Sequence, residues 1–81
     1  MKLTIIFLDG YKGWNVTKVK TKEVMDPFNE TTCRDAFASV EGLDDEESSM
    51  SLKAMFGNKP RIKGNVLTCM GEEGGVVFVG E

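Results

Sequence analysis

Apolar residues at both ends of the chain follow the two-residue period of β-strands. Between residues 3 and 8 both alternating sets of side chains are apolar apart from Thr4, which predicts a central strand that is buried on both faces. Residues 61–70 and 76–79 are rich in β-branched side chains and flank a glycine-rich turn at 71–75. They predict a hairpin in the last third of the chain.

Residues 14–24 predict a second, longer strand with a different character. A strict period of two places Trp14 and Val16 on one face together with three lysines, Lys18, Lys20 and Lys22. A strand with so polar a second half is typical of a sheet edge, where lysines discourage unwanted pairing with other strands.

The middle of the chain changes to a helical period. Asp26-Pro27 predicts a helix start, and an apolar face with helical spacing follows, ending before a stop at Gly42. That face consists of Cys33, Ala36, Phe37 and Val40. Four acidic residues at 44–47 predict the start of a second helix, which ends at residues 57–60.

The predicted order of elements is therefore ββααββ. We expect an α+β fold, with a largely antiparallel sheet and one or two helices on one face. A chain of 81 residues is the size of one domain, so residues 1–81 are interpreted as a single domain. Its longest apolar run has four residues, at 5–8, so we expect neither a membrane span nor a secretory leader.

Charge divides the chain into three parts around a net charge of −3. Residues 1–25 carry five lysines and two acidic residues, whereas residues 26–50 carry one arginine and eight acidic residues. Four of these acidic residues are consecutive: Asp44, Asp45, Glu46 and Glu47. They are interpreted either as a solvated helix start or as a negative docking surface for a basic partner.

The lysine row predicts a negatively charged partner instead of a basic one. Lys18, Lys20 and Lys22 with Trp14 form the combination of a basic track and a stacking aromatic ring that binds single-stranded nucleic acid. The competing interpretations are an edge strand protected by lysines and a tryptophan that packs within the hairpin. Because the whole chain is net negative, direct nucleic-acid binding is the less favoured hypothesis.

The reactive residues of the sequence are few. It contains no histidine and two cysteines, Cys33 and Cys69, which are interpreted as small buried apolar residues whose pairing stays open. Without histidine, neither thiol has the usual activating base. The acidic run 44–47 does not match a calcium loop. We therefore expect no enzymatic activity, no metal site and no cofactor.

The leading hypothesis is a small acidic, non-enzymatic, cytoplasmic protein that binds another protein. The surface of that partner is basic and normally binds nucleic acid. Its specific form is an inhibitor or modulator of a host enzyme, as phages encode. One alternative is a nucleic-acid-binding module that uses Trp14 and the lysine strand. The other is a subunit of an obligate homo-oligomer that pairs through the strand at residues 76–79.

Overall fold

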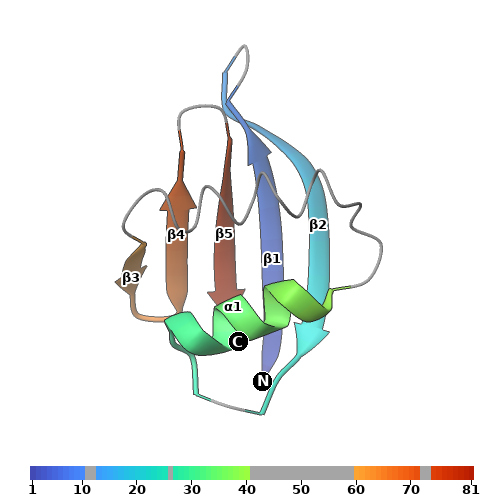
Figure 1. Cartoon of the computed structure of the whole chain (residues 1–81), viewed down its shortest axis with the longest axis vertical. Helices are drawn as coiled ribbons and strands as arrows, with labels where there is room; N and C mark the ends of the chain where they lie inside the picture. Colours follow the sequence, from blue (N-terminus) through green and yellow to red (C-terminus); the bar gives the residue numbers. More distant parts are fainter. Residues whose placement is uncertain (11–12, 26, 41–59, 72–73) are drawn as a thin grey trace.

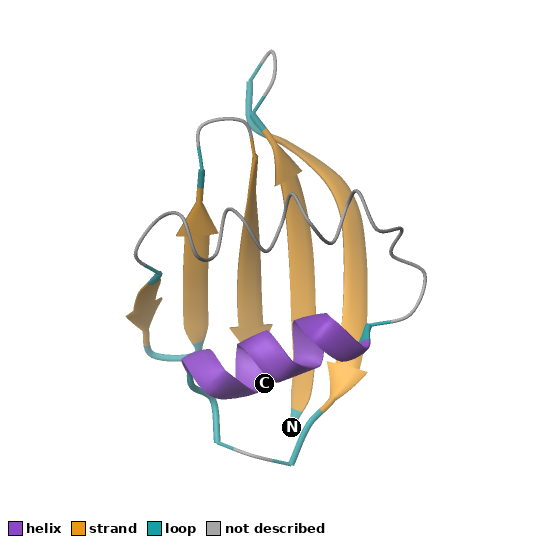
Figure 2. Cartoon of the chain, in the orientation of Figure 1, coloured by secondary structure: helices purple, strands orange, loops and turns teal. Residues whose placement is uncertain are grey.

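The computed structural model describes residues 1–10, 13–25, 27–40, 60–71 and 74–81. Five strands form one antiparallel sheet in the order β2-β1-β5-β4-β3, and one described helix, α1, crosses one face of it (Figures 1 and 2). The elements are β1 (Lys2–Asp9), β2 (Asn15–Glu23), α1 (Glu30–Ser39), β3 (Arg61–Lys63), β4 (Val66–Met70) and β5 (Gly74–Gly80). The predicted α+β class is confirmed at this level.

The strand at residues 2–8 is an interior strand, as predicted. β1 pairs with β2 on one side and with β5 on the other. Only one of its faces is fully buried, however: Leu3, Ile5 and Phe7 lie in the core, whereas Thr4, Ile6 and Leu8 are half-buried. The prediction of burial on both faces was wrong, because α1 lies on one side of the sheet.

The region predicted as one strand at 61–70 is two strands. Gly64 has a φ of 58° and, with Asn65, forms a two-residue turn that pairs Lys63 with Val66. A positive φ strains residues that carry a Cβ, which is why glycine stands at this turn. β5 then lies between β1 and β4. Both of its edges are therefore paired, and the strand at 76–79 has no edge for pairing with another copy.

α1 begins later than the Asp26-Pro27 motif predicts. Its N-cap is Asn29, whose side-chain Oδ1 accepts a hydrogen bond from the Thr32 amide at 2.8 Å. The Thr32 hydroxyl donates to the Pro27 carbonyl at 2.7 Å and holds the preceding segment against the first turn. The helix ends with Val40 as its C-cap, before the predicted stop at Gly42. The predicted second helix lies outside the described residues.

The core forms where α1 meets the sheet. The helical face predicted from the sequence is confirmed, since Cys33, Ala36 and Phe37 are buried and Val40 packs against them at the end of the helix. The Phe37 ring lies between two strand rings, with centroid distances of 5.8 Å to Phe7 on β1 and 6.4 Å to Phe78 on β5. Such tilted and edge-on pairs add to the energy of apolar burial.

Removing the Phe37 ring tests this arrangement. Phe37 is 1% exposed, and Phe37→Ala should lower the free energy of unfolding by about 3–5 kcal/mol. Asp35→Ala, on the exposed side of the same helix, is the matched control and should change it by about 0.5 kcal/mol or less. The measurement is a urea titration. A loss below about 1 kcal/mol for Phe37→Ala would mean that α1 does not pack on this sheet.

Candidate functional site

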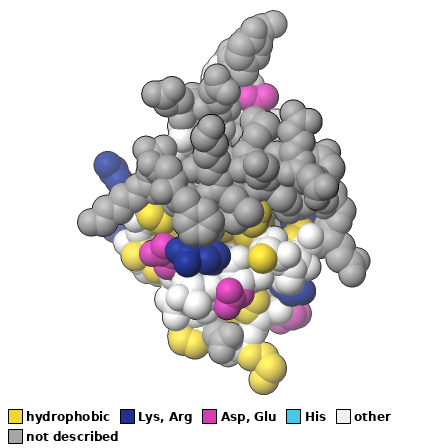
Figure 3. Space-filling view, in the orientation of Figure 1, with side chains coloured by type: hydrophobic (Ala, Val, Ile, Leu, Met, Phe, Trp, Pro, Cys, Tyr) yellow, Lys and Arg dark blue, Asp and Glu magenta, His cyan; other side chains and the backbone are white. Residues whose placement is uncertain are grey.

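The acidic segment lies outside the part of the chain that the structure describes. Asp44, Asp45, Glu46 and Glu47 fall in the interval 41–59, which is not among the described residues. Their interpretation as a docking surface therefore stays a prediction. Among the described charged residues, seven basic and five acidic, both signs are interspersed on the helix side of the molecule (Figure 3). One such pair joins Arg34 and Glu30 at 3.1 Å on α1.

The three lysines of the predicted nucleic-acid site do share one face of β2. Lys18, Lys20 and Lys22 stand opposite the core residues of β1 in the strand register, and facing residues of an antiparallel pair point to the same side of the sheet. The lysines are thus on the side that α1 covers, and they are half-buried. β2 is an edge strand of the described sheet, as predicted.

Trp14 and Val16 do not lie on the lysine face, so this prediction was wrong. The register between β1 and β2 shifts after Phe7, so that Phe7 faces Lys18 while Leu8 faces Val16, and Thr17 is the extra residue. A bulge of this kind reverses the alternation of side chains. Val16 therefore shares the opposite face with Leu8, which the strict two-residue period could not reveal.

Trp14 lies in the loop before β2. A Cβ atom on Gly10 would come within 2.9 Å of the Trp14 ring, so the indole packs directly over that glycine. The side chain is still 50% exposed. Its packing within the hairpin supports the structural interpretation, and its position outside β2 separates it from the lysine row.

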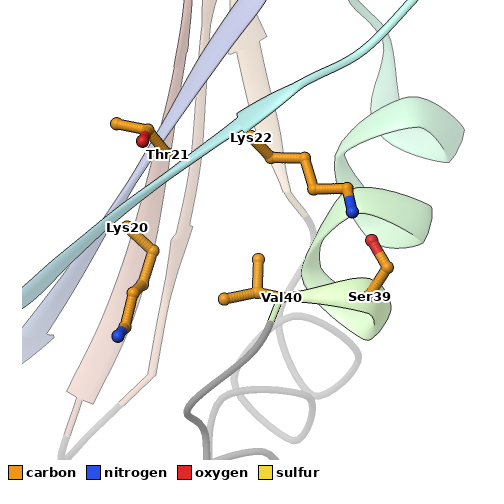
Figure 4. Close-up of a pocket in the computed structure, with 5 residues that line it drawn as sticks. All are labelled: Lys20, Thr21, Lys22, Ser39 and Val40. Atoms are coloured by element: carbon orange, nitrogen blue, oxygen red, sulfur yellow. The ribbon is translucent and has the colours of Figure 1, made fainter.

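Lys20 and Lys22 line a hollow between β2 and the C-terminal end of α1 (Figure 4). The hollow measures about 240 Å³ and is completed by Thr21 and by Ser39 and Val40 at the C-terminal end of α1. Figure 4 shows the Lys22 ammonium group directed toward the Ser39 hydroxyl. No ion pair to Lys20 or Lys22 is found within the described residues. α1 has no basic residue in its last turn, so Lys22 places a cation near the negative end of the helix dipole.

An apolar surface lies on the face of the sheet opposite α1, and it was not expected from the sequence. Eight apolar side chains are half-buried or exposed there: Ile6, Leu8, Val16, Val19, Val66, Met70, Val77 and Val79. Val19 is 53% and Val66 39% exposed, and Val16 on the same face is 59% exposed. We call this surface the open face. Its signal in the sequence was the apolar character of both alternating sets in the strands.

The open face is apolar in the middle and charged at its margins. Cross-strand register aligns Val19, Ile6 and Val77 in one row that continues through Thr68 to Arg61. Met70, on the same face, covers Gly75, where a Cβ would come within 2.6 Å of the Met70 sulfur. Contiguous exposed apolar surface of this kind is typical of protein–protein contact sites.

The two cysteines are free and buried. Burial, reinforced by the neighbouring Cys69, raises the pKa of the Cys33 thiol to about 12. Burial and the Glu30 carboxylate raise the pKa of the Cys69 thiol to about 11. Because thiolate is the nucleophilic form, both residues are poor nucleophiles at neutral pH. The described residues contain no group of three or more residues suited to holding a metal ion.

No family model, curated protein or solved structure matches this chain. In the part of the chain that the structure covers, no helix has the length and apolar character needed to cross a membrane.

The buried thiols predict a loss of stability at alkaline pH. The native state holds its thiol protons above pH 9.0, the ordinary pKa, while the unfolded state releases them. The contribution of the two thiols to the free energy of unfolding is therefore fully present below about pH 9. It is lost as the pH rises toward 11–12. The slope should approach about 1.4 kcal/mol per pH unit for each thiol.

The measurement is urea unfolding at several pH values between about 8 and 11. The double variant Cys33→Ala/Cys69→Ala retains every lysine and tyrosine, so it controls for their titration. Its stability should decline less steeply with pH than that of the parent protein. Identical slopes for the two proteins would show that the thiols are not buried.

Proposed function

We propose that this chain is a small, non-enzymatic, cytoplasmic protein that acts by binding another protein. The observation that carries the proposal is the open face, which presents apolar side chains of β2, β1, β5 and β4 on one side of the sheet. Burying such a surface against a partner is favourable by about 25 cal/mol for each Å² removed from water. The protonated, buried thiols support a binding role over nucleophilic chemistry.

The proposed partner carries a basic surface that meets Asp44, Asp45, Glu46 and Glu47. Capping and dipole compensation at a helix start employ only one or two carboxylates, so a run of four exceeds a structural need. Clustered like charge increases the rate of association with an oppositely charged partner more than it increases affinity. In this account the acidic run orients the encounter, and the open face supplies the contact area.

The specific form of the proposal is an inhibitor or modulator, of the kind that phages encode, that occupies the nucleic-acid-binding surface of a host enzyme. A run of carboxylates competes there for the same lysines and arginines that bind phosphate groups. The small size of the domain and its net charge of −3 agree with that role.

Direct nucleic-acid binding is the second candidate, and the hollow beside Lys20 and Lys22 favours it. One feature of the geometry weighs against it, because Trp14 lies outside the strand that carries the lysines. A stacking platform requires aromatic rings interleaved with the basic track, and this face of β2 has none.

Two variants separate the contributions of the proposed surfaces. Val19→Glu places a charge at an exposed position in the apolar row of the open face and should abolish capture of the partner. Ala38→Glu, on the exposed side of α1, is the matched control and should retain capture. Glu46→Gln/Glu47→Gln should slow association and flatten its salt dependence, while changing stability by only about 0.5 kcal/mol.

The measurement is affinity capture from a host lysate with mass spectrometry, followed by association kinetics with the identified protein at two ionic strengths. Equal capture by the Val19→Glu and Ala38→Glu variants would contradict a role for the open face. An unchanged association rate in the glutamine variant would favour the interpretation of residues 44–47 as a solvated helix start. A dimer of this chain that Val19→Glu dissociates would instead identify the open face as a contact between two copies of the chain.

A further inference from the structure

We propose that the outer edge of β2 binds an extended acidic segment of another protein, which adds a strand to the sheet. This site is distinct from the open face and goes beyond the function proposed above. It combines three features of the described residues: an unpaired row of backbone groups, a row of lysines and the hollow at the end of α1.

The backbone of β2 offers hydrogen-bonding groups on its outer side. The Val24 amide donates to the Met1 carbonyl, and the Met1 nitrogen donates to the Val24 carbonyl, both at 2.8 Å. Successive residues of a strand direct these groups to alternate sides. The groups of Lys22 and Lys20 therefore also point toward β1, whereas those of Val19, Thr21 and Glu23 point away from the sheet.

The lysine side chains determine which segment fits. On an added antiparallel strand, the residues opposite Lys20 and Lys22 occupy non-hydrogen-bonded positions, where facing side chains are closest. Carboxylates at those two positions lie beside the ammonium groups, above the hollow that Ser39 and Val40 complete. Charge-assisted hydrogen bonds of this type are roughly twice as strong as neutral ones.

The same lysines exclude a second copy of this chain from the site. Antiparallel pairing of β2 with another β2 around Thr21 sets Lys20 against Lys22 of the other copy. Like charges directly opposite each other destabilise a strand pair. The edge is therefore unfavourable for self-association and complementary to a strand with acidic residues at alternate positions.

The intervening positions of the segment face Val19, Thr21 and Glu23, which are on the side of the open face. β-branched apolar residues fit there, because they extend the apolar row across the sheet. The expected segment thus alternates acidic and β-branched residues over at least five positions. Backbone hydrogen bonds supply affinity, and the acidic positions supply specificity.

The probe is a labelled peptide, acetyl-Thr-Val-Glu-Val-Glu-Val-Thr-amide, titrated with the full chain by fluorescence anisotropy at low and high salt. Saturable, salt-sensitive binding is expected. Lys20→Glu/Lys22→Glu should weaken it by about tenfold or more, and replacing both peptide glutamates by lysine should restore binding to that variant. Binding that is indifferent to these charge changes would overturn the proposal.

Methylation of single peptide nitrogens tests strand addition directly. Methylating the central valine removes an N–H that bonds to Thr21 and should abolish binding. Methylating a glutamate nitrogen, which faces away from β2, is the matched control and should retain it. Equal effects of the two methyl groups would contradict strand pairing in this register.

Thr21→Pro removes an outward N–H from the protein side without breaking the β1–β2 ladder, because proline is tolerated on edge strands where the N–H faces solvent. It should abolish peptide binding, and the methylated peptides provide the same test if this variant fails to fold. A single-stranded oligonucleotide of matched length is the competing probe. Binding of the oligonucleotide in place of the peptide would overturn the proposal and favour nucleic acid at the lysine row.

Discussion

The antiparallel pairing of β1 with β5 is the contact on which the rest of the structure depends. It joins strands from the two ends of the chain in the centre of the sheet, so that β2 lies on one side and the β3–β4 hairpin on the other. The pairing also aligns Ile5 with Phe78 and Phe7 with Val76 on one face. Without it, α1 has no continuous apolar surface to cover, and Phe37 loses the two rings between which it packs. Contacts so distant in sequence are entropically costly to form, because a long stretch of chain must be closed before they are made.

One helix on one side of the sheet has a direct functional consequence. A sheet whose strands are apolar on both faces needs a layer on each side to bury them, and among the described residues α1 covers one side. Within that part of the chain, the open face and the outer edge of β2 are two surfaces at which this protein can gain contacts. Their characters differ, because the face is apolar and binds by area, whereas the lysine-bearing edge binds by hydrogen bonds and charge. The two surfaces can select different partners, or different parts of one partner.

Local patterns in the sequence predicted local structure well. The spacing of Cys33, Ala36 and Phe37 identified the buried face of α1, and the alternation in β2 identified its lysine row. Features that depend on a single backbone position were missed: the bulge at Thr17 reverses the side-chain alternation, and Gly64 divides one apparent strand into two. The central place of β5 could not be predicted, because strand order is a tertiary property that its Val-rich sequence does not encode. The same limit hid the open face, since its residues gather only when four strands align.

Strand addition requires that β2 is a true edge, paired to β1 on one side and accessible on the other. Native-state amide hydrogen exchange tests this most directly, because it measures each backbone N–H separately. The amides of Lys20 and Lys22 should be protected, whereas those of Val19, Thr21 and Glu23 should exchange rapidly. The amides of Leu3 and Ile5, which bond to β2 across the ladder, should be protected as strongly as those of Lys20 and Lys22. Uniform protection along β2 would show that its outer side is already covered, and it would contradict both the edge and the binding site assigned to it.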